Sequence, residues 1–252
     1  MIKVLIVGQT PPPYGGQAIM IEEILRLRYP GLQLIHARMD FSENMEDMGK
    51  VKLKKLTKLI KLIAQIIWLR ISTGANILYY PPAGPNRVPV IRDLIILISI
   101  RWMFKKTVFH FHAGGLTEIY PQLSTPLQIL FKIAYSKPDA TIRLSELNPE
   151  DGKNLASRQE FVIPYGIEDP TKTYPISKRG SRSQPLLLYV AVLRESKGLL
   201  VLLESCRRLL DRGIGFSLEV MGRFESKEFE IRVQKSIEDN GLKDQNRRFN
   251  LK

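Results

Sequence analysis

Segments that favour strands alternate with segments that favour helices along most of this 252-residue chain. Apolar runs rich in β-branched or aromatic residues lie at 2–8, 31–37, 76–80, 107–112, 139–144 and 160–164. Between them, apolar residues recur at helical spacing in segments 17–28, 51–71, 88–104, 126–136 and 147–157. This order is typical of β-α-β units, so we predict an α/β protein whose parallel sheet is covered by helices on both faces.

Residues 169–185 interrupt the alternation with prolines, a glycine and a run of Ser, Lys and Arg, which is linker composition. The alternation then restarts, with strands predicted at 186–192 and 216–221 and helices at 198–211 and 226–240. We therefore expect a complete Rossmann-like domain over 1–168 and a partial one over 186–252. Because a doubly wound domain usually needs on the order of 100–150 residues, we expect the chain to be truncated within the second.

The chain is strongly basic, with 38 Lys and Arg against 25 Asp and Glu and a net charge of +13. Such an excess predicts an anionic partner, which could be nucleic acid, phospholipid head groups or a phosphorylated substrate. A single cysteine, Cys206, excludes an internal disulfide and indicates a reducing compartment. No apolar run is long enough to span a bilayer. We expect a cytoplasmic protein that can bind the inner face of the cell membrane peripherally.

Residues 50–71 combine lysines with apolar residues at helical spacing. One predicted apolar face contains Leu56, Leu59, Ile60, Ile63 and Ile67. Off that face lie Lys54, Lys55, Lys58 and Lys61, and Trp68 is near the apolar end. This pattern is typical of an interfacial membrane helix, although a sheet-covering helix with solvated lysines remains open. Nucleic acid is disfavoured, because no stacking aromatics alternate with the lysines and no nucleic-acid-binding motif is present.

The loop from Pro11 to Gln17 follows the first predicted strand and contains Gly15 and Gly16. A strand that runs through glycines into a helix directs backbone N–H groups to one point, where a phosphate or sugar oxygen can bind. The glycines permit close approach because they lack Cβ. The spaced G-x-G-x-x-G of dinucleotide-binding proteins is absent, and a tight turn without a ligand remains the alternative.

Two histidines, His110 and His112, lie at alternate positions near the end of a predicted central strand and therefore on the same face. Ligands of open α/β sheets bind beyond the carboxyl ends of the strands. We therefore expect His112 to hydrogen-bond a substrate hydroxyl and His110 to be a core residue. No third ligand accompanies them at a spacing that would predict a metal site.

In the second domain, a predicted strand leads into the basic loop Arg194-Glu195-Ser196-Lys197 at the start of a helix. A cation placed there can stabilise the charge on a leaving phosphate. The alternative is a solvated lysine near a helix N-terminus, which is mildly unfavourable with the helix dipole.

Taken in order, five segments resemble the GT-B glycosyltransferases of family 4: Gly15-Gly16, the strand ending in His112, 144–146, 164–168 and 190–198. The resemblance extends to about residue 240. It implies two Rossmann-like domains across a cleft, with the acceptor on the N-terminal and a nucleotide-sugar donor on the C-terminal domain. It further implies retention of anomeric configuration, no metal requirement, and an acceptor linked to a membrane lipid in surface polysaccharide or glycolipid assembly.

Carried over by position, the resemblance implies that Gly15 and Gly16 approach the donor phosphates or the acceptor. His112 would contact the transferred sugar, and Lys197 would stabilise the departing diphosphate. Val192 stands where the family has Arg, so Arg194 is the candidate substitute. The family's Glu-x7-Glu segment would lie beyond residue 252. The alternative to an active transferase is thus an inactive remnant that serves as an acceptor- or membrane-binding module.

Overall fold

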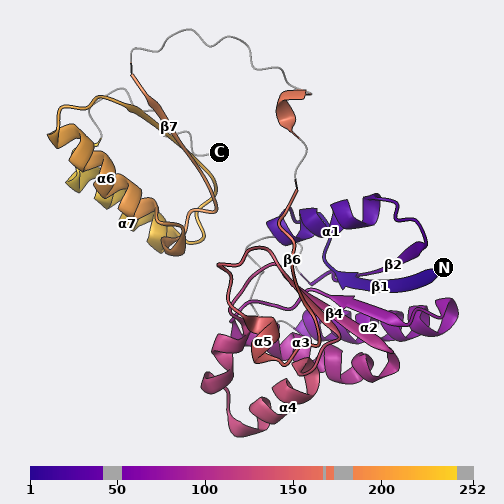
Figure 1. The fold of residues 1–252 in the computed structure, drawn as a ribbon. Helices are drawn as coiled ribbons and strands as arrows, with labels where there is room; N and C mark the ends of the chain where they lie inside the picture. The colour runs from indigo at the N-terminus through magenta and orange to yellow at the C-terminus, as the bar shows by residue number, and fades with distance from the viewer. Residues whose placement is uncertain (42–52, 167–168, 173–183, 243–252) are drawn as a thin grey trace. The chain divides into compact units, whose positions relative to one another are not determined.

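The computed structural model describes residues 1–41, 53–166, 169–172 and 184–242. The chain divides into two compact units, Met1–Glu168 (unit 1) and Asp169–Lys252 (unit 2), which are described one at a time (Figure 1).

Unit 1 contains a six-stranded sheet with the strand order β2-β1-β3-β4-β5-β6, and every neighbouring pair is parallel. The strands are β1 (Ile2–Gly8), β2 (Leu32–Arg38), β3 (Ile77–Tyr80), β4 (Lys106–Phe111), β5 (Ala140–Arg143) and β6 (Glu160–Val162). Their bounds agree with the predicted ones to within two residues. The predicted α/β class with a parallel sheet is confirmed.

The helical segments of unit 1 are α1 (Gly16–Arg26), α2 (Leu53–Thr73), α3 (Arg87–Ile100), η2 (Arg101–Met103), η3 (Leu116–Gln122), α4 (Thr125–Tyr135) and α5 (Asp151–Asn154). Helix α1 covers one face of the sheet, and α2, α3 and α4 lie side by side on the other (Figure 1). The larger core fills the second interface, around Leu78, Leu97 and Phe109, while Ile21 of α1 packs with Ile6 and Tyr79 of the sheet in the first.

The helix predicted over 147–157 is wrong in extent, because only one turn, α5, forms. Ala156 adopts a left-handed φ of 55°, which ends the helix. The Asp151 side chain also accepts hydrogen bonds from Gly115 and Thr117 in the loop after β4. The sequence pattern could not indicate either feature.

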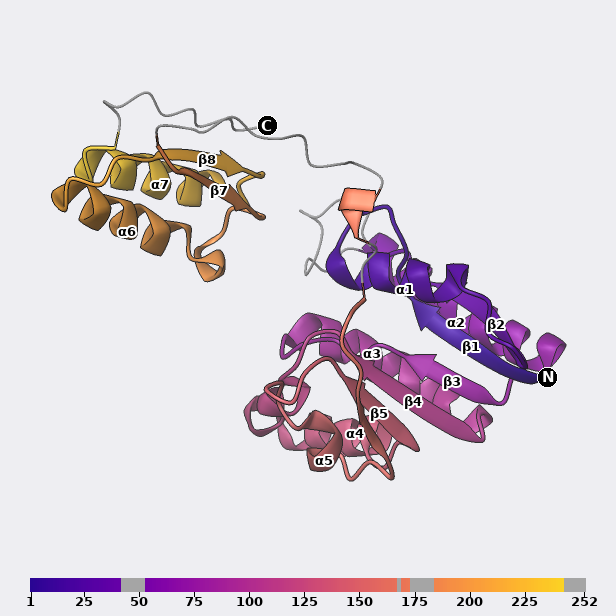
Figure 2. The same ribbon diagram turned by 45° about the horizontal axis from the view of Figure 1, so that its top comes forward.

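Unit 2 contains two parallel strands, β7 (Leu186–Val190) and β8 (Ser217–Met221). Its helical segments are η4 (Pro170–Lys172), η5 (Glu195–Lys197), α6 (Leu199–Asp211) and α7 (Lys227–Asp239). Helices α6 and α7 pack on one side of the strands (Figure 2), where Leu203, Val220 and Val233 are buried. On the other side Leu188 and Val190 are exposed. Most of the predicted linker, from 173 to 183, lies outside the described residues.

Candidate functional site

Four aromatic rings form a ladder toward the carboxyl edge of the unit 1 sheet. The Tyr79 hydroxyl lies 2.5 Å from Nδ1 of His110. The rings of His110 and His112 stack with centroids 4.2 Å apart, as expected for side chains on one face. Tyr165, which follows β6, stacks on the outer side of His112 at 5.6 Å, and its hydroxyl is hydrogen-bonded to His112 Nδ1.

The two histidines are neutral at physiological pH. Burial lowers the pKa of His110 to about 4. Burial and, secondarily, the neighbouring His110 lower the pKa of His112 to about 3. Burial also raises the pKa of Tyr165 to about 12, so its hydroxyl stays protonated. The ladder can therefore exchange hydrogen bonds with a ligand, but its imidazoles are too weakly basic to be charged at pH 7.

Neither ring nitrogen of His112 is open to solvent in this arrangement. Nδ1 is hydrogen-bonded to Tyr165, and Nε2 is buried with no hydrogen-bond partner among the described residues. The Tyr165 hydroxyl thus occupies the position that sequence reasoning assigned to a substrate hydroxyl. His110 is buried, as expected of a core residue, yet its Nε2 also has no partner within the described part of the chain.

The loop after His112 is held by a buried carboxylate that sequence reasoning missed. Asp151 is only 1% exposed. Its Oδ2 accepts a hydrogen bond from the Gly115 backbone at 2.7 Å, and its Oδ1 accepts two from Thr117 at 2.8 Å. Gly115 has a left-handed φ of 88°, and a Cβ on Gly114 would lie 2.7 Å from Pro149. Both glycines are therefore needed for the geometry of this loop.

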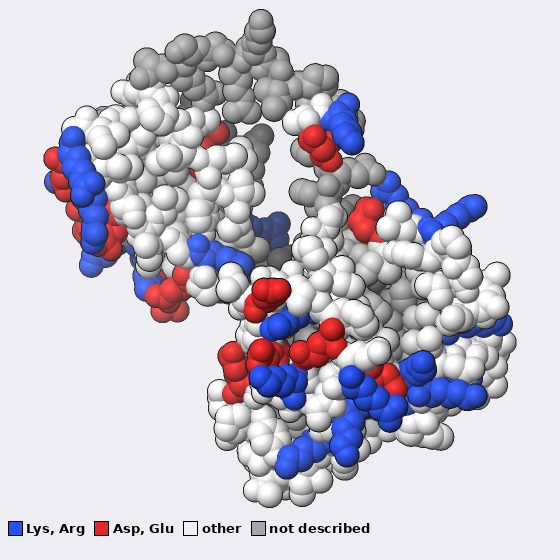
Figure 3. Space-filling view, in the orientation of Figure 1, with Lys and Arg blue, Asp and Glu red and all other residues white. Residues whose placement is uncertain are grey.

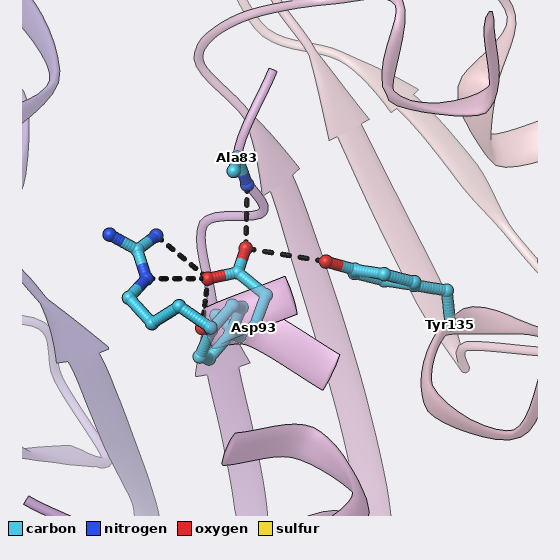
Figure 4. Close-up of polar contacts among 5 residues, drawn as sticks. Ala83, Asp93 and Tyr135 are labelled. Carbon is cyan, nitrogen blue, oxygen red and sulfur yellow. Dashed lines mark hydrogen bonds and ion pairs between the residues drawn. The ribbon is translucent and has the colours of Figure 1, made fainter. Parts of the chain in front are cut away.

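A second buried carboxylate, Asp93 on α3, holds the loop that follows β3 (Figure 4). Its Oδ1 accepts hydrogen bonds from the Tyr80 hydroxyl at 2.8 Å and from the Arg92 guanidinium at 2.7 and 2.9 Å. Its Oδ2 accepts from the Ala83 N–H at 2.8 Å and the Tyr135 hydroxyl at 3.3 Å. Burial and the Asp93 charge raise the pKa of both tyrosines, so they remain donors.

The Asp93 contacts bear on the site because the loop that they fix adjoins the His112 loop. Ala83 precedes Gly84, and a Cβ on Gly84 would lie 3.3 Å from the Cβ of Ala113, the residue after His112. This arrangement has no direct signal in the sequence, because an acidic residue within an apolar helix can equally point to solvent.

The glycine loop lies at the same edge of the sheet, where β1 ends. Gly15 is the N-cap of α1, and no side chain in the described ranges caps that helix. Among the described residues, none lies within 4 Å of a Cβ built on Gly15 or Gly16, so these two positions are not packed against another part of that structure. Arg38, at the end of β2, donates to the Pro12 carbonyl at 2.7 Å and fixes the loop. Strand β3 separates β1, which leads into this loop, from β4, which leads into His112.

In unit 2, Lys197 is exposed in the turn between β7 and α6, at the carboxyl end of the strand. Arg194 precedes it and forms a loose ion pair with Glu225 at 3.9 Å. The turn is braced against the loop after β8, where Gly222 has a φ of 150° and a Cβ would lie 1.8 Å from the Ala191 carbonyl oxygen. Only glycine fits there, so this contact sets the path of the Lys197 loop.

Helix α2 does not have the single apolar packing face that the sequence predicted. Leu59 is buried, but Leu56 and Ile60 are 52% and 59% exposed. The reason is that the face by which α2 packs on the core contains Leu62 and Ile66 together with Leu59, Ile63 and Ile67 of the predicted set, and this leaves Leu56 and Ile60 outside it.

Of the basic residues predicted on α2, Lys61 is exposed and Lys58 pairs with Asp40 at 3.4 Å. The side chains of Lys54 and Lys55 lie outside the described part of the chain, and Trp68 is 66% exposed. No helix in the described ranges is long and apolar enough to cross a membrane. Among residues whose positions are described, no group of three or more His, Cys, Asp or Glu could hold a metal ion.

No protein-family model matches the sequence, and no curated protein matches it. Solved structures do match. A glycosyltransferase from Rickettsia africae ESF-5 is similar with a TM-score of 0.54 and 14% identity, over 99% of this chain and 68% of that one. Anabaena Alr3699/HepE, in complex with UDP and glucose, is similar with a TM-score of 0.53 and 11% identity, over 100% and 69%. The chain thus has the α/β fold of GT-B glycosyltransferases.

Proposed function

We propose that this protein is a glycosyltransferase that transfers a sugar from a nucleotide-sugar donor, with the retaining mechanism of family 4. The observation that supports this most directly is the neutral His112 at the carboxyl end of β4, where open α/β sheets bind ligands. A neutral imidazole paired with a hydroxyl group is suited to hold a sugar. The similar Anabaena structure contains UDP and glucose, which favours a donor of this class.

In this proposal a hydroxyl of the transferred sugar displaces the Tyr165 hydroxyl from His112 Nδ1. Gly15 and Gly16 leave the N-terminus of α1 open to an anionic group. Lys197, with Arg194 beside it, stabilises the departing diphosphate. We expect no metal to be required, because these two side chains supply the positive charge.

We further propose that the acceptor is linked to a membrane lipid and that the transfer serves surface polysaccharide or glycolipid assembly at the cytoplasmic face of the membrane. Helix α2 supports a membrane contact through Lys54, Lys55, Lys58, Lys61 and Trp68. It contains no acidic residue, and its Lys61 and Trp68 are exposed. A surface of this kind is attracted to anionic lipid.

A second candidate is a catalytically inactive acceptor- or membrane-binding module. One observation favours it: the two-stranded sheet of unit 2 leaves Leu188 and Val190 exposed on its uncovered side.

The test is release of nucleoside diphosphate from a panel of UDP- and GDP-sugars, with a membrane lipid extract as the source of acceptor. We expect Lys197→Ala to lower turnover about a hundredfold, as loss of one transition-state-stabilising group does elsewhere, and His112→Ala to impair it as well. Lys235→Ala, an exposed lysine on α7, is the matched control. An active preparation that tolerates both site substitutions would refute the site, and a folded chain without turnover would favour the binding module.

A further inference from the structure

The outer surface of the α2–α3–α4 layer carries an unusual number of exposed apolar side chains. We define the apolar helix face by six of them: Ile60, Trp68 and Ile71 on α2, Ile95 on α3, Trp102 on η2 and Ile133 on α4. Trp68, Ile71 and Trp102 are 66%, 69% and 77% exposed. Water-soluble monomers rarely leave such large apolar side chains clustered in solvent.

The side chains near the C-terminal ends of α2 and α4 and those on η2 lie on neighbouring elements, because these elements are hydrogen-bonded together. Arg70 Nε donates to the Met103 carbonyl at 2.9 Å and ties the end of α2 to η2. Arg101 Nη1 donates to the Ala134 carbonyl at 2.8 Å and ties η2 to α4. Trp102 and Ile133 line the same groove, of about 430 Å³. The two tryptophans and Ile133 are therefore held on neighbouring, fixed elements.

The charged side chains around the apolar helix face are mostly basic. Across α2, α3, η2 and α4 the sequence has one acidic residue, Asp93, and it is fully buried. Exposed lysines border the face, among them Lys61, Lys105, Lys132 and Lys137. Figure 3 shows many Lys and Arg over the lower part of unit 1, with some Asp and Glu among them, beside uncharged surface. One acid, Asp139, lines the groove of Trp102 and Ile133, but it pairs with Arg158 at 3.3 Å, so the border stays net positive and complements an anionic partner.

Tryptophan, isoleucine and lysine together indicate a lipid partner. Tryptophan favours the boundary between head groups and acyl chains, and flanking lysines favour anionic head groups. The Trp102 indole N–H already donates to the Ser99 carbonyl at 2.9 Å, so the ring can enter an apolar layer without losing a hydrogen bond. We propose that the apolar helix face is the surface by which unit 1 lies on an anionic membrane.

This inference deepens the proposed function and rests on it only for the identity of the acceptor. It places the main membrane contact on apolar side chains of α2, α3, η2 and α4, including Trp102 and Ile133, rather than on the lysines of α2. Because vesicle binding needs no sugar transfer, failure to bind would leave the transferase proposal intact, and absent turnover would leave the membrane surface intact.

The test uses the full chain, with vesicles of phosphatidylcholine alone or mixed with phosphatidylglycerol. The chain has two tryptophans, and both lie on the apolar helix face, so tryptophan fluorescence, excited selectively over the nine tyrosines, reports on this surface. We expect a blue shift, quenching by brominated acyl chains and co-sedimentation with the anionic vesicles. The double variant Ile60→Gln/Ile71→Gln should bind at least about tenfold more weakly.

The matched control is Ile231→Gln on α7, since Ile231 and Ile71 are both 69% exposed. It should bind like the wild type. The proposal would be overturned by no binding to anionic vesicles, by equal binding to neutral ones, or by unchanged binding of the double variant. A blue shift that depends on protein concentration without lipid would overturn it too, because the face would then bind a second copy.

Discussion

At the scale of single residues, two buried carboxylates organise the carboxyl edge of the unit 1 sheet. Asp151 holds the loop after β4, and Asp93 holds the loop after β3. Each accepts hydrogen bonds through both oxygens, which offsets the cost of burying a charge. Their contacts are far apart in sequence, since Asp151 lies 36 positions from Gly115 and Asp93 lies 42 from Tyr135.

Replacing Asp93 should therefore destabilise unit 1. Asp93→Ala leaves the Arg92 charge, two tyrosine hydroxyls and the Ala83 N–H without their acceptor, and we expect a loss of about 3–5 kcal/mol in the free energy of unfolding. Urea unfolding followed by tryptophan fluorescence measures this, because Trp68 and Trp102 both belong to unit 1.

Glu150→Ala is the control for that substitution. Glu150 pairs with Lys153 at 3.0 Å in an exposed position, so its loss should change stability by less than about 1 kcal/mol. If Asp93→Ala and Glu150→Ala unfolded at the same urea concentration, the buried hydrogen bonds of Asp93 would not have the structural role assigned here.

At the scale of elements, the aromatic ladder on β4 makes stability depend on pH. The folded-state pKa values of His110 and His112, about 4 and about 3, lie below the ordinary value of about 6.5. Below pH 6.5 the unfolded chain thus binds more protons than the folded one. Stability should be fully present above pH 6.5 and should fall as the pH is lowered toward 4, by up to about 1.4 kcal/mol per pH unit for each ring.

Urea unfolding at pH 7 and pH 5 checks this expectation, and NMR titration of the three histidines shows which rings have lowered pKa values. Tyr165→Ala should raise the pKa of His112, because it uncovers the ring that Tyr165 stacks on. The account of the ladder would be wrong if His112 titrated near 6.5 in the wild type, or if stability were the same at both pH values.

The elements were largely predictable, and their contacts were not. The alternation of apolar runs placed β1 to β8 because buried parallel strands are continuously apolar. Five apolar side chains of α2 were predicted to share one face, but Leu56 and Ile60 are exposed. Helical periodicity alone does not show which side of a helix meets the sheet. The pairing of His112 with Tyr165, 53 positions apart, has no local signal. The predicted roles of Gly15, Gly16, Arg194 and Lys197 remain predictions.

At the scale of the whole molecule, the chain joins two units whose elements match GT-B glycosyltransferases along the sequence. Each unit places a distinctive group at the carboxyl end of a parallel strand: His112 after β4 in unit 1 and Lys197 after β7 in unit 2. This repeated position, where α/β sheets bind ligands, is the reason for assigning the sugar to one unit and the diphosphate to the other.

Calorimetric titration of the purified chain with a panel of UDP- and GDP-sugars tests the central claim, that the protein uses a nucleotide-sugar donor. We expect one sugar nucleotide to bind at micromolar strength, about −8 kcal/mol, and Lys197→Ala to weaken that binding while Lys235→Ala leaves it unchanged. A chain shown by circular dichroism to be folded that binds none of the panel would contradict the claim.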